Sequence, residues 1–190
     1  WSLEIYVTEK YLKRRFYNFF KEKNVLEFKN VKNYFLDNTE TYKIVFVDGF
    51  FDPFLSQTSH DGVDICILSA ALTKPVYSKI ISKYFDTSIN TKDSLSLVNT
   101  AFAKEGVYVH IPKNKILDKP IEVLHFTTGN EAALMLQPRN LIVVEENAQV
   151  EIIETHQSLT ENPIFTNSVT EIFVGQNAHL DYYKIQNDRL

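Results

Sequence analysis

The chain has 190 residues, a formal net charge of −4 and a hydrophobic share of 44%, which is ordinary globular composition. These values exclude a disordered chain, a collagen-like chain and a coiled coil. The acidic balance argues against nucleic acid or an anionic membrane as a main partner. No apolar run approaches the roughly 18 residues of a membrane span. The single cysteine, Cys66, cannot form an internal disulfide, so we expect a reducing, cytoplasmic location.

The first third of the chain mixes helix and strand patterns. Apolar residues at helical spacing predict a helix over about residues 9–23. Residues 44–47 form an apolar run that predicts a strand, and Asp48-Gly49 then predicts a tight hairpin turn. The return strand is Phe50-Phe51, and a further strand is expected over 63–68.

The middle third is more helical, and strands follow it. Helical spacing predicts a helix beginning near Pro75 and a second capped by Thr91 or Asp93. Gly106 suits the position after the second helix. We expect a mixed α/β region over residues 1–104 and β-structure over 105–190. Within the second region, about 131–136 fits either helix or strand. The expected strands of the second region are 107–111, 121–124, 141–144, 150–153, 172–174 and 180–185.

The most informative feature is an internal repeat at a constant offset. The segment 142–153 aligns with 172–183, and Asn-Ala falls at the same place in both copies. A looser earlier copy runs over about 109–123. A fixed period of this size is typical of a solenoid, in which equivalent strands stack as parallel neighbours about 4.8 Å apart. The alternative is a β-sandwich whose hairpins resemble one another.

Stacking at this offset predicts the facing of each side chain. Val150 should lie over Leu180 and point inward, whereas Gln149 should point outward. Asn147 and Asn177 should occupy corners, where asparagine tolerates a positive φ. The other pairs of this scheme are Ala148 with Ala178, Ile152 with Tyr182, Glu151 with Asp181 and Glu154 with Lys184.

Several stretches are similar to motifs of the SufB/SufD family. Residues 44–51 resemble its V-N-G hairpin, with Asp48 in place of the usual asparagine. Residues 97–106 resemble its L-N-x-A-F-x-x-x-G stretch, with Val98 intervening, and the most specific match is 138–156. SufB-type chains carry Glu-Gly-Cys where this one has Glu154-Thr155-His156, so the resemblance favours the SufD branch. Val109-His110-Ile111-Pro112 and Lys119-Pro120-Ile121-Glu122-Val123 resemble the family's V-x-V-P and P-I segments.

The resemblance covers roughly residues 44–190 and implies both a fold and a role. The implied fold is mainly β, a right-handed parallel β-helix preceded by an N-terminal α/β region. The implied role is iron–sulfur cluster assembly in a complex with SufB and the ATPase SufC. The family's partner-contacting residues lie in its C-terminal part, which would follow Leu190. We therefore expect this chain, which begins at Trp1, to be the N-terminal portion of a longer protein.

No residue stands out as a catalytic or metal-binding group. Two pairs, Glu154 with His156 and His179 with Asp181, could each share a strand face, but two ligands make an incomplete metal site. Cys66 lies in an apolar run and is expected to be a small buried side chain. We assign no catalytic, cofactor-binding or metal residue and expect no cofactor, and a metal-binding module stays open as a third possibility. The histidines, which lack metal-site spacing, are His60, His110, His125, His156 and His179.

The acidic residues raise one alternative from a different class. Paired carboxylates on a β-helix could act as acid and base in a carbohydrate-active enzyme. Outward faces of coils carry such residues anyway, so we favour a solvated face. We also expect the basic residues near the N-terminus to be solvated and the phenylalanines near the hairpin to pack on the core. These sets are Glu145, Glu146, Glu151 and Glu154; Lys10, Lys13, Arg14 and Arg15; and Phe50, Phe51 and Phe54.

The sequence thus predicts a non-catalytic scaffold subunit that acts with SufB-like and SufC-like subunits. A β-helix that stops at its last strands leaves backbone groups unpaired. We therefore expect self-association through the edge at about residues 172–185.

Overall fold

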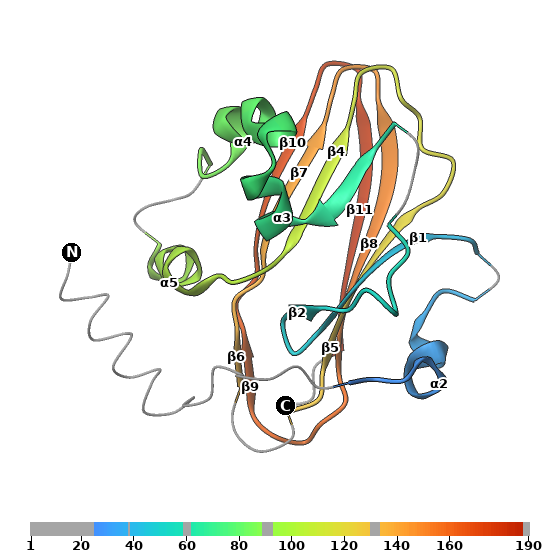
Figure 1. The fold of residues 1–190 in the computed structure, drawn as a ribbon, viewed down its shortest axis with the longest axis vertical. Coiled ribbons are helices and arrows are strands. Elements are labelled where there is room, and N and C mark those ends of the chain that lie inside the picture. Colours follow the sequence, from blue (N-terminus) through green and yellow to red (C-terminus); the bar gives the residue numbers. More distant parts are fainter. Residues whose placement is uncertain (1–24, 38, 59–61, 89–92, 130–133, 188–190) are drawn as a thin grey trace.

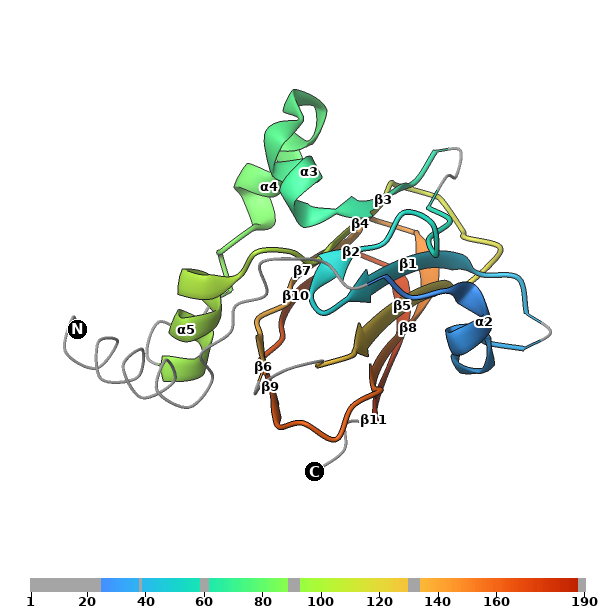
Figure 2. The same cartoon turned by 60° about the horizontal axis from the view of Figure 1, so that its bottom comes forward.

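The computed structural model describes residues 25–37, 39–58, 62–88, 93–129 and 134–187. The helix expected over 9–23 lies outside these residues. Three β-sheets surround a common interior, and short helices lie outside them (Figures 1 and 2). The strands are β1 (Tyr42–Val47), β2 (Phe50–Phe51), β3 (Asp64–Ile67), β4 (Val107–Ile111), β5 (Ile121–Thr127), β6 (Leu134–Leu136), β7 (Arg139–Val144), β8 (Gln149–Ser158), β9 (Ile164–Thr166), β10 (Val169–Val174) and β11 (His179–Asn187).

The described helices are short. They are α2 (Phe28–Val31), α3 (Leu68–Thr73), α4 (Ser78–Tyr84) and α5 (Ser94–Phe102), with 3₁₀ turns η1 (Lys32–Tyr34) and η2 (Pro75–Tyr77). Asp93 caps α5 as expected, because its carboxylate accepts a hydrogen bond from the Ser96 backbone N–H. None of the described helices is long and apolar enough to cross a membrane.

From β4 onward the chain visits the three sheets in a fixed order. It runs through β4, β5 and β6, then β7, β8 and β9, and returns to the first two sheets with β10 and β11. The sheet orders are β11-β8-β5-β1-β2, β10-β7-β4-β3 and β6-β9. All pairings among β4 to β11 are parallel.

The predicted register between the two copies is confirmed. Val150 pairs with Leu180 and Ile142 with Ile172, as the offset of the sequence repeat requires. The corner asparagines Asn114, Asn147 and Asn177 have φ values of 60°, 56° and 54°. The Asn147 backbone N–H donates to the Gln176 carbonyl of the next passage at 3.0 Å. The two copies therefore lie directly on one another.

The N-terminal region contributes strands to both large sheets. β1 pairs in parallel with β5, and β3 pairs antiparallel with β4. The Asp48-Gly49 hairpin is confirmed, because both residues have positive φ and β1 pairs antiparallel with β2. The regions 1–104 and 105–190 thus share sheets.

Three groups of apolar side chains hold the layers together. The interior group lies between the sheets and includes Ile44, Val109, Val123 and Ile142, all at most 1% exposed. Val31 and Phe35, of α2 and the segment after η1, cover the outer face of β1 and β5. Helices α3 and α4 cover the outer face of β4 and β7 (Figure 1).

One expectation about a helix end needs correction, and one assignment that the sequence left open is now resolved. Gly106 does not end α5, which stops at Phe102 with Ala103 as its C-cap. A Cβ on Gly106 would lie 1.7 Å from the Arg139 carbonyl oxygen, so glycine is needed where the chain enters β4 against β7. Residues 131–136, which fitted either helix or strand, contain the strand β6, whose three residues are buried.

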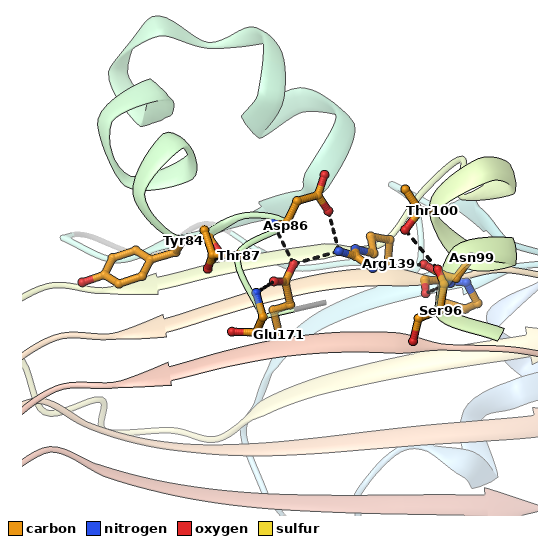
Figure 3. A network of polar contacts seen from close by, with 10 residues as sticks. Tyr84, Asp86, Thr87, Ser96, Asn99, Thr100, Arg139 and Glu171 are labelled. Atoms are coloured by element: carbon orange, nitrogen blue, oxygen red, sulfur yellow. Dashed lines mark hydrogen bonds and ion pairs between the residues drawn. The ribbon is translucent and has the colours of Figure 1, made fainter. Parts of the chain in front are cut away.

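A buried ion-pair network joins the turn after α4 to the sheet below it (Figure 3). The Arg139 guanidinium lies 2.8 Å from Glu171 and 2.5 Å from Asp86. Glu171 also accepts hydrogen bonds from the backbone N–H groups of Asp86 and Ser88. Because the Arg139 and Glu171 side chains are 4% and 3% exposed, neither charge has water as an alternative partner.

Replacing Val150 by aspartate is expected to unfold the stacked strands. Val150 is 2% exposed, and an unpaired carboxylate there would cost about 3 kcal/mol or more. Gln149→Asp places the same group on the exposed face and should change the free energy of unfolding by less than about 0.5 kcal/mol. Urea denaturation followed by circular dichroism measures both, and equal losses would mean that the faces are misassigned.

Replacing Arg139 by methionine is expected to cost about 3 kcal/mol of unfolding free energy, because Glu171 would stay buried without its cation. The control is Lys113→Met, which removes an exposed pair with Glu146 and should leave the unfolding free energy close to that of wild type. A loss in Arg139→Met no larger than that of the control would contradict the role given to the network.

Candidate functional site

Polar side chains enter the apolar interior toward the C-terminal ends of β5 and β8. His125, Glu154 and His156 form what we call the histidine–glutamate cluster, and their exposed fractions are 5%, 1% and 3%. One potential ligand atom from each residue lies within 4.8 Å of the others. A buried charge must be paired, so the partners of Glu154 decide what this cluster can do.

Strand alternation and register bring the cluster together. His125 pairs with His156 across β5 and β8, and Val123 pairs with Glu154. The His125 ring stacks on His156 at 4.4 Å between ring centroids and on Phe46 of β1 at 4.9 Å. Three aromatic rings on three neighbouring strands therefore form one column inside the sheets.

Three side chains surround the Glu154 carboxylate. His156 Nε2 lies 2.6 Å from Glu154 Oε1, and the Tyr182 hydroxyl donates to Oε2. Lys184 Nζ is 3.1 Å from Oε1, which confirms the pair expected from the repeat. The carboxylate thus has partners on its own strand and on β11. The expectation of a solvated Glu154 was wrong, because an even-numbered residue of β8 faces inward.

The electrostatics of the cluster favour an ionised glutamate and a neutral His125. Burial alone would raise the pKa of Glu154, but the hydrogen bond with His156 and the charge of Lys184 outweigh it and lower that pKa. Burial, reinforced by His156, lowers the pKa of His125 to about 3. Burial and the neighbouring Glu154 raise the pKa of the Tyr182 hydroxyl, which stays protonated.

A small cavity of about 50 Å³ lies beside His125, on the side of the hairpin. Phe46 and His125 line it together with the Asp48-Gly49 turn and residues 134–138. The cavity is large enough for a water molecule or an ion. His125 Nε2 is buried and has no hydrogen-bond partner in the described part of the chain.

Two imidazoles and a carboxylate are ligands for a divalent transition metal, and sequence reasoning did not join them. Glu154 and His156 were paired as neighbours on one strand, but His125 was treated as isolated. The β5–β8 pairing brings His125 beside His156. Extending the looser first copy past Val123 and aligning it with β8 would have found the third group.

The structure separates most other residues weighed from the sequence. His179 and Asp181 are exposed on β11. His110 lies 3.2 Å from Asp64 and 3.5 Å from Glu145. His60 and the basic residues 10–15 lie outside the described residues.

Cys66 is half-buried on β3, and burial raises the pKa of its thiol. This keeps the sulfur protonated and a weak nucleophile.

Phe51 packs beside the interior group as expected. Phe54 is 95% exposed, so the expectation that it packs on the core was wrong.

The unfolding free energy of the chelator-treated protein is expected to fall as pH drops from 6.5 toward 4.5. The unfolded imidazole takes up a proton near pH 6.5, whereas the folded His125, with a pKa of about 3, does not. The unfolded state then binds more protons, at a slope of up to about 1.4 kcal/mol per pH unit. Urea titrations across this range should show a shallower slope in His125→Phe.

His179→Phe is the matched control for this pH dependence, because it removes an exposed histidine and should keep the wild-type slope. Identical slopes in wild type and His125→Phe would show that His125 is not held neutral in the fold.

Comparison with protein families and curated proteins gives a consistent assignment. The family described as "SufBD protein N-terminal region" matches residues 8–123. The family described as "SUF system FeS cluster assembly, SufBD core domain" matches residues 125–190. The chain belongs to the SufB/SufD family, as its motifs indicated.

Individual relatives are much longer than this chain. It is 31% identical over 172 residues to an iron–sulfur cluster assembly SufBD family protein of Synechocystis, covering 83% of this chain and 36% of the relative. It is 28% identical over 116 residues to the iron–sulfur cluster assembly protein SufD of Bacillus subtilis, covering 58% of this chain and 26% of that protein. The chain thus spans little more than a third of these relatives at most.

Proposed function

We propose that this chain is part of a non-catalytic scaffold subunit for iron–sulfur cluster assembly, SufD-like, that acts with SufB-like and SufC-like subunits. Family membership supports the assembly role, because the relatives' names state it of those proteins. The observation that carries the scaffold role is the constant register of β7 with β10 and β8 with β11. A stack of strands in fixed register is a rigid body on which partners can be held. A cytoplasmic location belongs to the same proposal.

We also propose that the passages through the three sheets are the first coils of a right-handed parallel β-helix. Its support is the repeated order of sheets and the repeated corner turn. In that turn the backbone N–H of Lys115, Ala148 and Ala178 donates to the carbonyl three residues earlier. Successive coils of this kind add parallel strands without changing the cross-section.

Further coils would be added at the end of the stack that is formed by β9, β10 and β11. Each is the last strand of its sheet among the described residues. Ile172, Val174 and Ile185 on these strands are 38%, 49% and 50% exposed. An apolar strand edge tends to pair with another strand. We propose that further coils cover this edge in a longer chain, and that a second copy covers it in the isolated 190-residue chain.

Among the described residues, the contacts of Glu154 and Glu146 do not favour the carbohydrate-active alternative. Glu154 is buried and its oxygens contact His156, Tyr182 and Lys184, so it is not poised as a general acid. Glu146 pairs with the exposed Lys113.

The full-length protein containing this chain is expected to elute as one complex when it is co-expressed with the SufB-like and SufC-like proteins of its source. Because the stack is the proposed platform, Val150→Asp should abolish co-elution, and the surface variant Gln149→Asp should preserve it. Size-exclusion chromatography with mass spectrometry of the peak measures this.

Two results would contradict the scaffold role. One is a full-length protein that elutes alone under all co-expression conditions. The other is hydrolysis of a polysaccharide panel by the purified protein that is lost in Glu154→Gln, which would favour the enzyme instead.

A further inference from the structure

The histidine–glutamate cluster is unusual for its position within the fold. Two inward positions earlier on the same strands, β5 and β8 carry Ile121 and Ile152, which are fully buried and apolar. At the cluster, the interior instead holds two imidazoles and a carboxylate within 4.8 Å of one another. Buried polar groups are retained where they are fully partnered or where they hold a ligand.

Hydrogen bonding does not account for the whole cluster. Glu154 is fully partnered, but His125 Nε2 has no hydrogen-bond partner among the residues that the structure describes. The His125 ring is held between Phe46 and His156 with interplanar angles of 9° and 10°. This stacked ring therefore keeps one nitrogen without a partner among the described residues, and one of its ring nitrogens lies within 4.8 Å of a Glu154 carboxylate oxygen. This arrangement leaves a donor atom available for a cation.

We propose that His125, Glu154 and His156 bind one divalent first-row transition-metal ion through two imidazole nitrogens and one carboxylate oxygen. Such a nitrogen-rich donor set suits iron, zinc, cobalt, nickel or copper better than calcium or magnesium. The inference stands on these side chains alone and does not depend on the scaffold role.

Binding requires a local rearrangement of the two histidines. Because the nitrogen lone pairs lie in the ring planes, the stacked rings must turn relative to each other before both can coordinate one ion. Metal–ligand bonds to histidine and glutamate are about 2.0–2.2 Å long, so the 2.6 Å contact between His156 Nε2 and Glu154 Oε1 must open. The ion then takes the place of the proton between these atoms, and His156 carries its proton on the other ring nitrogen. The cavity of about 50 Å³ that His125 lines has room for a water ligand.

Lys184 competes with the proposed ion. Its ammonium lies 3.1 Å from the Glu154 carboxylate and its side chain is 30% exposed, so it can turn to solvent when a cation arrives. Two positive charges on one carboxylate repel each other. Removing the lysine should therefore strengthen metal binding. A purely structural ion-pair cluster predicts no such gain.

The test is a Co²⁺ titration of the full-length protein after chelator treatment, followed by visible absorption and calorimetry. Wild type is expected to bind one more equivalent of Co²⁺ than His125→Phe does. If both bind the same number of equivalents, wild type should bind the Co²⁺ of this site at least about tenfold more tightly. Lys184→Met is expected to bind it more tightly than wild type. His179→Phe, which removes an exposed histidine, is the matched control and should bind as wild type does.

The phenylalanine keeps the ring column, and circular dichroism in chelator establishes that each variant is folded. If His125→Phe fails to fold, Glu154→Gln and the gain in Lys184→Met decide the question, since unfolding cannot produce tighter binding. The proposal is overturned if wild type binds no Co²⁺. It is also overturned if folded His125→Phe binds as wild type does, or if Lys184→Met shows no gain.

Discussion

Backbone hydrogen bonding between successive copies of the sequence repeat is the constraint on which this molecule depends. β8 pairs with β11 over nine residues and β7 with β10 over six, all in parallel and without a slip in register. The corners keep this register because Asn147 and Asn177 adopt the same left-handed backbone conformation. A shift of one residue would turn every inward side chain outward, so the hydrophobic interior and the corner geometry enforce the same alignment.

Parallel stacking also decides which polar groups meet. Each inward residue lies beside its counterparts on the strands on either side. A polar residue therefore pairs with a residue of that column. Glu154 pairs with Lys184 in this way, and the His125 ring stacks on Phe46 and His156. The side chains of Arg139 and Glu171, which pair across β7 and β10 two residues out of register, use the outer face in the same way. Glu154 and Arg139 thus each pair with a residue about one period away in sequence.

Much of the fold was accessible from the sequence, because the repeat is strict where the structure is most regular. The register, the corner asparagines, the Asp48-Gly49 turn and the Asp93 cap all have local signals. The complete site was not accessible. Glu154 and His156 were recognised as sharing a strand face, but the expected strand ended at Ile153, whereas β8 continues to Ser158. A polar side chain does not itself indicate burial. Its burial can be predicted only when its position is recognised as one that faces the interior. His125 was missed because the first passage has a different period from the second.

The differences in period show where this architecture tolerates changes in chain length. Counted between paired residues, the connection from β4 to β5 is two residues longer than the connection from β7 to β8. The strands on both sides nevertheless remain paired. Extra residues are absorbed as bulging loops at the rim, while an addition inside a strand would invert half of the interior. During evolution, such a chain can therefore lengthen by whole turns or at its corners, and relatives are expected to differ in size by these two steps.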